Sequence, residues 1–147
     1  MSLKFSQGIY KIQNPEKYIG TGTPRYRSSW EYTFMAFCDN NPSVHQWASE
    51  SVKIPYKDPL SGRNTVYVPD FLIVYMDKNH AKHAELIEIK PANQTVLEKV
   101  GKNAYNQAQY VKNMAKWAAA NNWCKNNGLK FRVINEQDIF HSGKSKR

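Results

Sequence analysis

Hydrophobic and β-branched residues in the middle of the chain gather in two long runs. Residues 65–76 (TVYVPDFLIVYM) and 83–91 (HAELIEIKP) are rich in the residue types that strands favour. The intervening DKNHAK is polar and typical of a turn, so the pattern predicts a β-hairpin that reverses about Asn79. Shorter apolar segments at residues 51–56 (SVKIPY) and 129–134 (LKFRVI) predict one further strand each.

Two other segments have the three-to-four-residue period of amphipathic helices. The first, SSWEYTFMAFCDN, can be capped by Ser28 and is ended by NNPS. The second extends from about Thr95 to Asn127, and Gly128 can end it. The stripe of this second helix that we expect to face the core comprises Leu97, Val100, Ala104, Ala108, Val111, Ala115 and Ala118. Lysines off this stripe, such as Lys116, are expected to be solvated.

The order of these elements, α-β-β-β-α-β, predicts the α/β class, with a mixed β-sheet flanked by helices. A chain of this length is typical of one domain, so we interpret residues 1–147 as a single domain. It would include an irregular N-terminal arm at residues 1–27, which is rich in loop-forming residues. Residues 141–147 (HSGKSKR) would form a basic flexible tail.

The composition indicates a folded, basic protein. A hydrophobic fraction of 41% is enough for a packed core, which argues against wholesale disorder. Lys and Arg exceed Asp and Glu by 21 to 12, and the net charge of +9 favours a polyanionic partner, either nucleic acid or an anionic membrane surface. No segment approaches the roughly 18 apolar residues of a membrane span, and the N-terminus lacks a secretory core. We therefore expect an intracellular protein that is not secreted.

Ionisable residues interrupt the apolar faces of the predicted hairpin. Side chains alternate along a strand, so Glu88 and Lys90 point to the same face. On the other strand Asp70 follows Pro69, and a symmetric turn about Asn79 places Asp70 opposite Glu88, with Cβ atoms roughly 5 Å apart. Facing carboxylates repel each other. A divalent cation such as Mg²⁺, which binds one or two carboxylates plus waters, removes that repulsion.

A site of this kind would be suited to phosphate chemistry. A bound divalent ion polarises a phosphoryl group and lowers the pKa of a bound water. Lys90 could orient that water or neutralise charge that develops on the phosphate. The alternative is an exposed sheet face on which Glu88 and Lys90 form a weak surface ion pair.

These residues resemble the signature of a nuclease superfamily. PD at residues 69–70 and EIK at residues 88–90 are similar to the motif of the PD-(D/E)xK nucleases, whose core is restriction-endonuclease-like, with the order αβββαβ. Over roughly residues 18–140 the chain also resembles the head-completion nucleases of T-even-type tailed phages and transposon-end endonucleases of the same fold. The segments that carry this likeness are YIGTGTPRYRSSWEYTFMAFCDNNPSVHQWASESVKIPY, VPDFLIVY, ELIEIKP and YVKNMAKWAAANNWC.

The resemblance implies roles for individual residues. Asp70 and Glu88 would bind a metal ion, with the backbone carbonyl of Ile89 as a further ligand. Lys90 would be the catalytic base or would orient the attacking water. The metal would be Mg²⁺, with Mn²⁺ as a substitute.

An acid from the first helix often joins such sites, and Glu31 lies at the matching position. The alternative is that Ser28 and Glu31 form only a capping box. Glu50 is the rival candidate for this role. Arg25 and Arg27, in the loop before the helix, could contact a DNA phosphate or could be ordinary solvated arginines.

Motif and resemblance together predict a metal-dependent DNA endonuclease that hydrolyses phosphodiester bonds at the portal while phage heads are completed. The expected partners are double-stranded or branched DNA and phage portal or neck proteins, and not a membrane. The expected location is the host cytoplasm during infection, or the virion. Two alternatives stay open: a non-catalytic DNA-binding neck protein, and a junction-resolving or restriction-type nuclease.

Overall fold

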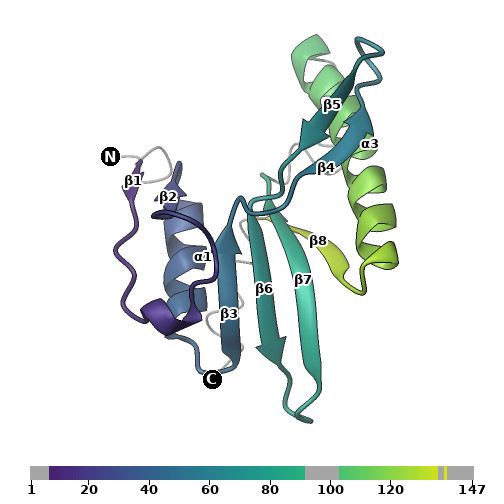
Figure 1. The fold of residues 1–147 in the computed structure, drawn as a ribbon. Coiled ribbons are helices and arrows are strands. Elements are labelled where there is room, and N and C mark those ends of the chain that lie inside the picture. The colour runs from purple at the N-terminus through teal and green to yellow at the C-terminus, as the bar shows by residue number, and fades with distance from the viewer. Residues whose placement is uncertain (1–6, 92–102, 136–137, 139–147) are drawn as a thin grey trace.

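The computed structural model describes residues 7–91, 103–135 and 138, and it has a four-stranded mixed sheet at its centre (Figure 1). In spatial order the strands are β3 (Val44–Ser49), β6 (Phe71–Met76), β7 (Lys82–Ile89) and β8 (Lys130–Ile134). β6 is antiparallel to both of its neighbours, β3 and β7, whereas β8 is parallel to β7. The parallel pair requires a crossover, which passes through the long helix.

A helix covers each face of this sheet. α1 (Ser29–Asn40) packs on one face and α3 (Ala104–Asn126) on the other (Figure 1). Because side chains alternate along β7, Ile87 joins the core beneath α1 and Leu86 joins the core beneath α3. The predicted fold class is therefore confirmed. Within the described residues, neither helix combines the length and the apolar character that crossing a membrane would take.

The β6–β7 hairpin has the register that the sequence predicted. Phe71 pairs with Ile87, and the pairs that follow are centred on Asn79. One step further along this register, Asp70 lies beside Glu88 at the end of the hairpin. The placement of the carboxylates thus follows from the turn.

The run at residues 65–76, predicted as one strand, is divided into two. Its first part belongs to β5 (Asn64–Tyr67), which pairs with β4 (Ile54–Lys57) in a two-stranded ribbon outside the main sheet. The second part is β6, which begins only at Phe71. Pro69 explains the break, because proline has no N–H to donate to a strand ladder.

Strand β3 is not predicted by the sequence. His45 and Gln46 are exposed and interrupt its apolar pattern, although the side chain of Trp47 is fully buried. The strand predicted at residues 51–56 exists as β4, but it lies in the ribbon. Three strands of the main sheet lie between α1 and α3 in the chain, so the predicted αβββαβ order holds. Its first strand is β3 and not the predicted strand at residues 51–56.

Helix α3 turns a different face toward the sheet from the one predicted. The residues of α3 that are buried are Asn113, Trp117, Ala120 and Cys124. In the predicted stripe Ala104, Val111 and Ala118 are exposed, Ala108 and Ala115 are half-buried, and Leu97 and Val100 lie outside the described residues. Trp117 explains the rotation, because burying one indole removes far more apolar surface from water than burying an alanine.

The predicted caps of both helices are present. Ser28 caps α1, since its Oγ accepts a hydrogen bond from the N–H of Glu31 at 3.2 Å. Gly128 follows α3 with φ +73°, and the N–H of Leu129 donates to the carbonyl of Cys124 at 2.9 Å. This is the Schellman arrangement that glycine permits. The second helix was predicted to begin at about Thr95, but α3 begins only at Ala104. Asn103 has an extended backbone and caps the helix, since its side-chain oxygen accepts a hydrogen bond from the N–H of Asn106 at 3.0 Å. Thr95 itself lies outside the described residues.

The N-terminal arm differs from the irregular segment predicted for residues 1–27. Its described part contains β1 (Gly8–Ile9), the 3₁₀ helix η2 (Pro15–Lys17) and β2 (Arg25–Tyr26). Asp39 of α1 anchors it, since its carboxylate accepts a hydrogen bond from the hydroxyl of Tyr10 at 2.7 Å. The basic tail predicted at residues 141–147 lies outside the described residues.

Candidate active site

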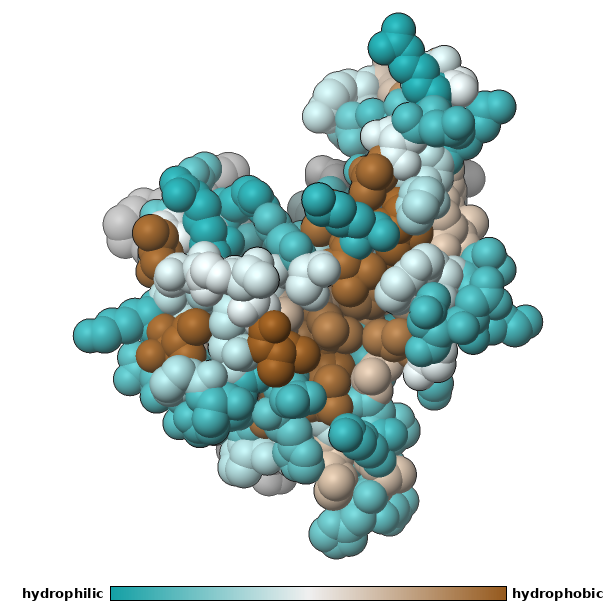
Figure 2. Space-filling view, in the orientation of Figure 1, coloured by the Kyte–Doolittle hydropathy of each residue, from teal (hydrophilic) through white to brown (hydrophobic). Residues whose placement is uncertain are grey.

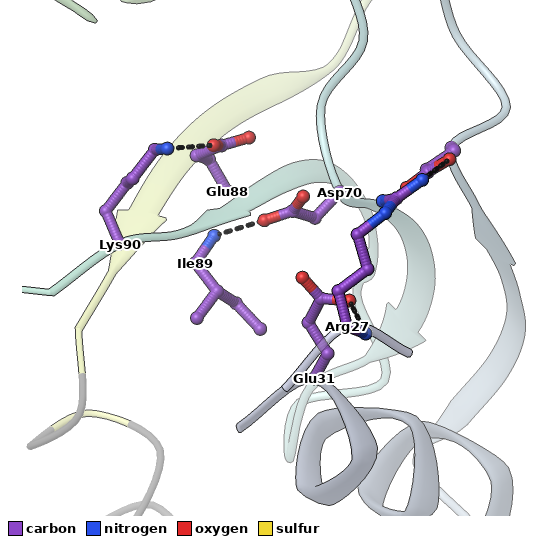
Figure 3. Close-up of polar contacts among 7 residues, drawn as sticks. Arg27, Glu31, Asp70, Glu88, Ile89 and Lys90 are labelled. Carbon is purple, nitrogen blue, oxygen red and sulfur yellow. Dashed lines mark hydrogen bonds and ion pairs between the residues drawn. The ribbon is translucent and has the colours of Figure 1, made fainter. Parts of the chain in front are cut away.

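Four ionisable side chains meet at the end of the sheet where β6 begins and β7 ends (Figure 3). Asp70 immediately precedes β6, and Glu88 and Lys90 lie at the end of β7. Glu31 reaches the same place from the first turn of α1 (Figure 3). The fold therefore brings together the four residues that the sequence predicted as catalytic, and three separate elements position them.

Asp70 is held by the backbone of both neighbouring strands. Its Oδ2 accepts a hydrogen bond from the N–H of Ile89 at 2.7 Å, and its carbonyl accepts one from the N–H of Glu50 at 2.9 Å. Burial raises the pKa of Asp70 well above its usual range, and the negative charge of Glu88 raises it further. The carboxylate is thus fixed in place while its charge is left poorly compensated.

Glu88 is buried, with 6% of its surface exposed. Its Oε1 accepts a hydrogen bond from the hydroxyl of Tyr67 at 2.8 Å, and its Oε2 lies 3.7 Å from the ammonium of Lys90. Burial raises the pKa of Glu88, whereas Lys90 and Tyr67 act in the opposite direction. The predicted placement of Glu88 and Lys90 on one face is confirmed, but a weak pair on an exposed sheet face does not describe a carboxylate this deeply buried.

Glu31 lies beside the site, and only half of the predicted capping box is formed at this helix start. Its backbone N–H is capped by Ser28, but its carboxylate accepts a hydrogen bond from the N–H of Arg27 at 2.9 Å rather than completing a capping box with Ser28. Burial raises the pKa of Glu31, and the nearby ammonium of Lys90 lowers it. Glu31 therefore holds the start of α1 and also adds negative charge at the site.

The rival acid, Glu50, is paired with an arginine at the edge of the site. Its carboxylate forms an ion pair with the guanidinium of Arg27, whose Nη2 lies 3.2 Å from Oε1. Glu50 has φ 50°, a left-handed conformation that is costly for a non-glycine residue. Of the two predicted arginines, Arg27 thus lies at the rim of the site, whereas Arg25 is exposed on β2 and pairs with Ile9 of β1.

Two residues at the site were missed by the sequence analysis. Tyr67 of β5 bonds to Glu88, and the ammonium of Lys116 lies 5.6 Å from the centroid of the Tyr67 ring. Lys116 is half-buried, and burial followed by the charge of Lys90 lowers its pKa. The signal that could have placed Lys116 here is its neighbour Trp117, which marks the face of α3 that meets the sheet.

The donor set at this site fits a divalent cation of the magnesium type. Among the residues that the structure describes, no group of three or more His, Cys, Asp or Glu side chains is arranged to hold a metal ion. A metal here would therefore rest on the pair Asp70 and Glu88, completed by water and backbone oxygen, as is usual for Mg²⁺. Burial raises the pKa of both carboxylates, so a positive charge held between them would stabilise their ionised forms.

The raised pKa values predict how the stability of the metal-free protein depends on pH. Because Asp70 and Glu88 bind protons more tightly in the folded than in the unfolded chain, their contribution to the free energy of unfolding falls as the pH rises above about 4. Melting temperatures in EDTA should therefore decline more steeply between pH 4 and pH 8 for the wild type than for the double variant Asp70→Asn, Glu88→Gln. Identical slopes for the two proteins would contradict the assignment.

A mixed sheet between two helices, with Pro-Asp immediately before one strand and Glu-x-Lys at the end of its neighbour, is the arrangement expected of a restriction-endonuclease-like nuclease. Residues 41–136 match the family model described as "TnsA-like endonuclease N terminal". The head completion nuclease of Enterobacteria phage T4 is 32% identical to the chain, over 90% of this chain and 92% of that protein. This chain therefore belongs to the TnsA-like endonuclease family and is a nuclease.

Proposed function

We propose that this protein is a Mg²⁺-dependent DNA endonuclease that acts in the completion of phage heads. The observation that carries the proposal is the convergence of Asp70 and Glu88 from neighbouring strands, with Lys90 beside Glu88. Membership of an endonuclease family supports the reaction, and the name of the T4 relative supports the biological role. Duplex or branched DNA would be the substrate.

In this proposal Asp70 and Glu88 hold the metal ion, Mg²⁺ or Mn²⁺, and the backbone carbonyl of Ile89 is a further ligand. When bound, the ion polarises the phosphodiester and lowers the pKa of a coordinated water. Ile89 fixes the Asp70 carboxylate through its N–H, and Tyr67 fixes that of Glu88 through its hydroxyl. Both carboxylates are therefore oriented before a ligand arrives, which lowers the cost of organising the site.

In the same proposal Lys90 assists the reaction. Its ammonium lies 3.7 Å from Glu88 and is partly exposed, so it can face a phosphate that approaches the two carboxylates. There it would orient the attacking water or neutralise charge on the phosphate. Glu31 would act from the side of α1, where it lies near both Asp70 and Lys90.

The biological setting follows from the same proposal. The protein would act in the infected host cell, on DNA at the portal, beside portal or neck proteins or within the virion. Contacts mainly to the DNA backbone would suit cutting with little sequence preference.

Purified protein should cut plasmid and linear duplex DNA in Mg²⁺ or Mn²⁺ and leave both intact in EDTA. A panel of duplex, single-stranded, flapped and four-way DNA should then rank the substrates, and preference for four-way DNA would favour a junction-resolving role. DNA binding without cutting in either metal would refute the nuclease proposal and support a non-catalytic neck protein.

A further inference from the structure

The β4–β5 ribbon stands apart from the main sheet. Within the described residues its two strands pair only with each other, and Figure 1 shows them extending beyond the sheet end where β6 begins. An isolated two-stranded ribbon is marginally stable in water, so this one needs support. Ile54 and Tyr67 supply it, because both are buried in the core that α3 forms.

The opposite face of the ribbon is free. Alternation places Pro55, Lys57, Asn64 and Val66 on this face, and all four are exposed. Lys53, which precedes β4, is exposed as well. We call these five residues the free face. It carries basic, polar and apolar side chains and no acidic one.

The tip of the ribbon is held in one conformation. Asp58 organises it: its carboxylate accepts a hydrogen bond from the N–H of Leu60 at 2.9 Å, and its carbonyl accepts one from the N–H of Gly62 at 2.7 Å. The ammonium of Lys112 on α3 lies 3.7 Å from the Asp58 carboxylate and ties the tip to the helix. Arg63, next to Gly62, is therefore presented on a fixed loop with its side chain exposed.

The ribbon leads directly into the site. Tyr67 ends β5 and bonds to Glu88, and Asp70 follows three residues later. Figure 2 shows a recess in the surface between the part of the molecule that contains α1 and the part that contains the ribbon. A ligand at the carboxylates would extend along the ribbon.

We propose that the free face and Arg63 form a binding surface for duplex DNA. This surface would hold the duplex so that the bond to be cut lies at the carboxylates. The inference deepens the proposed nuclease function and rests on it. A two-stranded β-ribbon is narrow enough to enter the major groove of DNA. Lys53, Lys57 and Arg63 would contact phosphates along the groove, while Val66 and Asn64 would face its interior.

Duplex binding in EDTA tests this inference separately from cleavage. The variant Lys57→Ala, Arg63→Ala removes two positive charges from the ribbon. The variant Lys78→Ala, Lys82→Ala removes two exposed lysines from the opposite end of the sheet and is the matched control. Fluorescence anisotropy with a labelled duplex, at several salt concentrations, measures the affinity of each, and melting temperatures establish that both variants are folded.

The ribbon variant should bind the duplex about tenfold more weakly, and its plot of log affinity against log salt should be shallower by about 2, one for each lost phosphate contact. The control should bind within about twofold of the wild type. Wild-type affinity in the ribbon variant would overturn the inference. An equal loss of affinity in the ribbon variant and the control variant would overturn it as well. Plasmid cleavage in Mg²⁺ by the wild type, scored in parallel, reports on the nuclease function alone, so either proposal can fail without the other.

Discussion

Replacing Asp70 with asparagine should abolish cleavage and, at neutral pH without metal, make the protein more stable. Asparagine keeps an oxygen that can accept the hydrogen bond from the N–H of Ile89, so the local geometry is retained. It removes the negative charge beside Glu88, and we expect the free energy of unfolding to rise by about 1 kcal/mol. The rate of cleavage should fall by on the order of 10³ or more, because a metal contributes several kcal/mol to charge stabilisation in the transition state.

Asp77, at the other end of the same hairpin, provides the control. Its carboxylate is well compensated: it interacts with His83 at 2.8 Å and accepts hydrogen bonds from backbone N–H groups, and these contacts lower its pKa. Asp77→Asn should therefore reduce stability and leave cleavage unchanged. The two substitutions are chemically identical and are expected to change stability in opposite directions. Cleavage by Asp70→Asn at the wild-type rate would refute the metal-site assignment.

The core of the site could be predicted from the sequence because it is local. Asp70, Glu88 and Lys90 lie within one hairpin, whose register is determined by the turn about Asn79 and by the alternation of side chains. A short segment thus contains both the ionisable side chains of the site and the strand register that places them side by side. The helix caps at Ser28 and Gly128 could be predicted for the same reason, because a cap depends on only a few neighbouring residues.

The remaining features depend on contacts between distant segments. The rotation of α3 is decided by Trp117 packing against the sheet and the ribbon, and this packing brings Lys116 to the site. The stripe of alanines followed the helical period equally well, but alanines have little apolar surface to bury. Tyr67 was missed for the same reason, since its bond to Glu88 exists only because Pro69 separates β5 from β6.

Lys90→Met should separate a role in the reaction from a role in holding Glu88. Methionine keeps most of the aliphatic volume but removes the ammonium that lies 3.7 Å from Glu88. Lys116 remains near Glu88 and still lowers its pKa, so the variant should fold. If Lys90 orients water or stabilises the phosphate, the maximal rate should fall by about 10² to 10³, as it does when one such donor is removed from other enzymes.

The dependence of cleavage on Mg²⁺ concentration decides between the two roles. A lysine that assists the reaction can be lost without weakening metal binding, because removing a positive charge beside the carboxylates does not disfavour a cation. The Mg²⁺ concentration for half-maximal rate should then stay the same or decrease, and excess Mg²⁺ should not restore the rate. A lysine that merely holds Glu88 predicts the reverse: a higher Mg²⁺ requirement and full recovery at saturation. Lys82→Met, on the exposed first residue of β7, should show neither change, because it lies at the far end of the strand from the carboxylates.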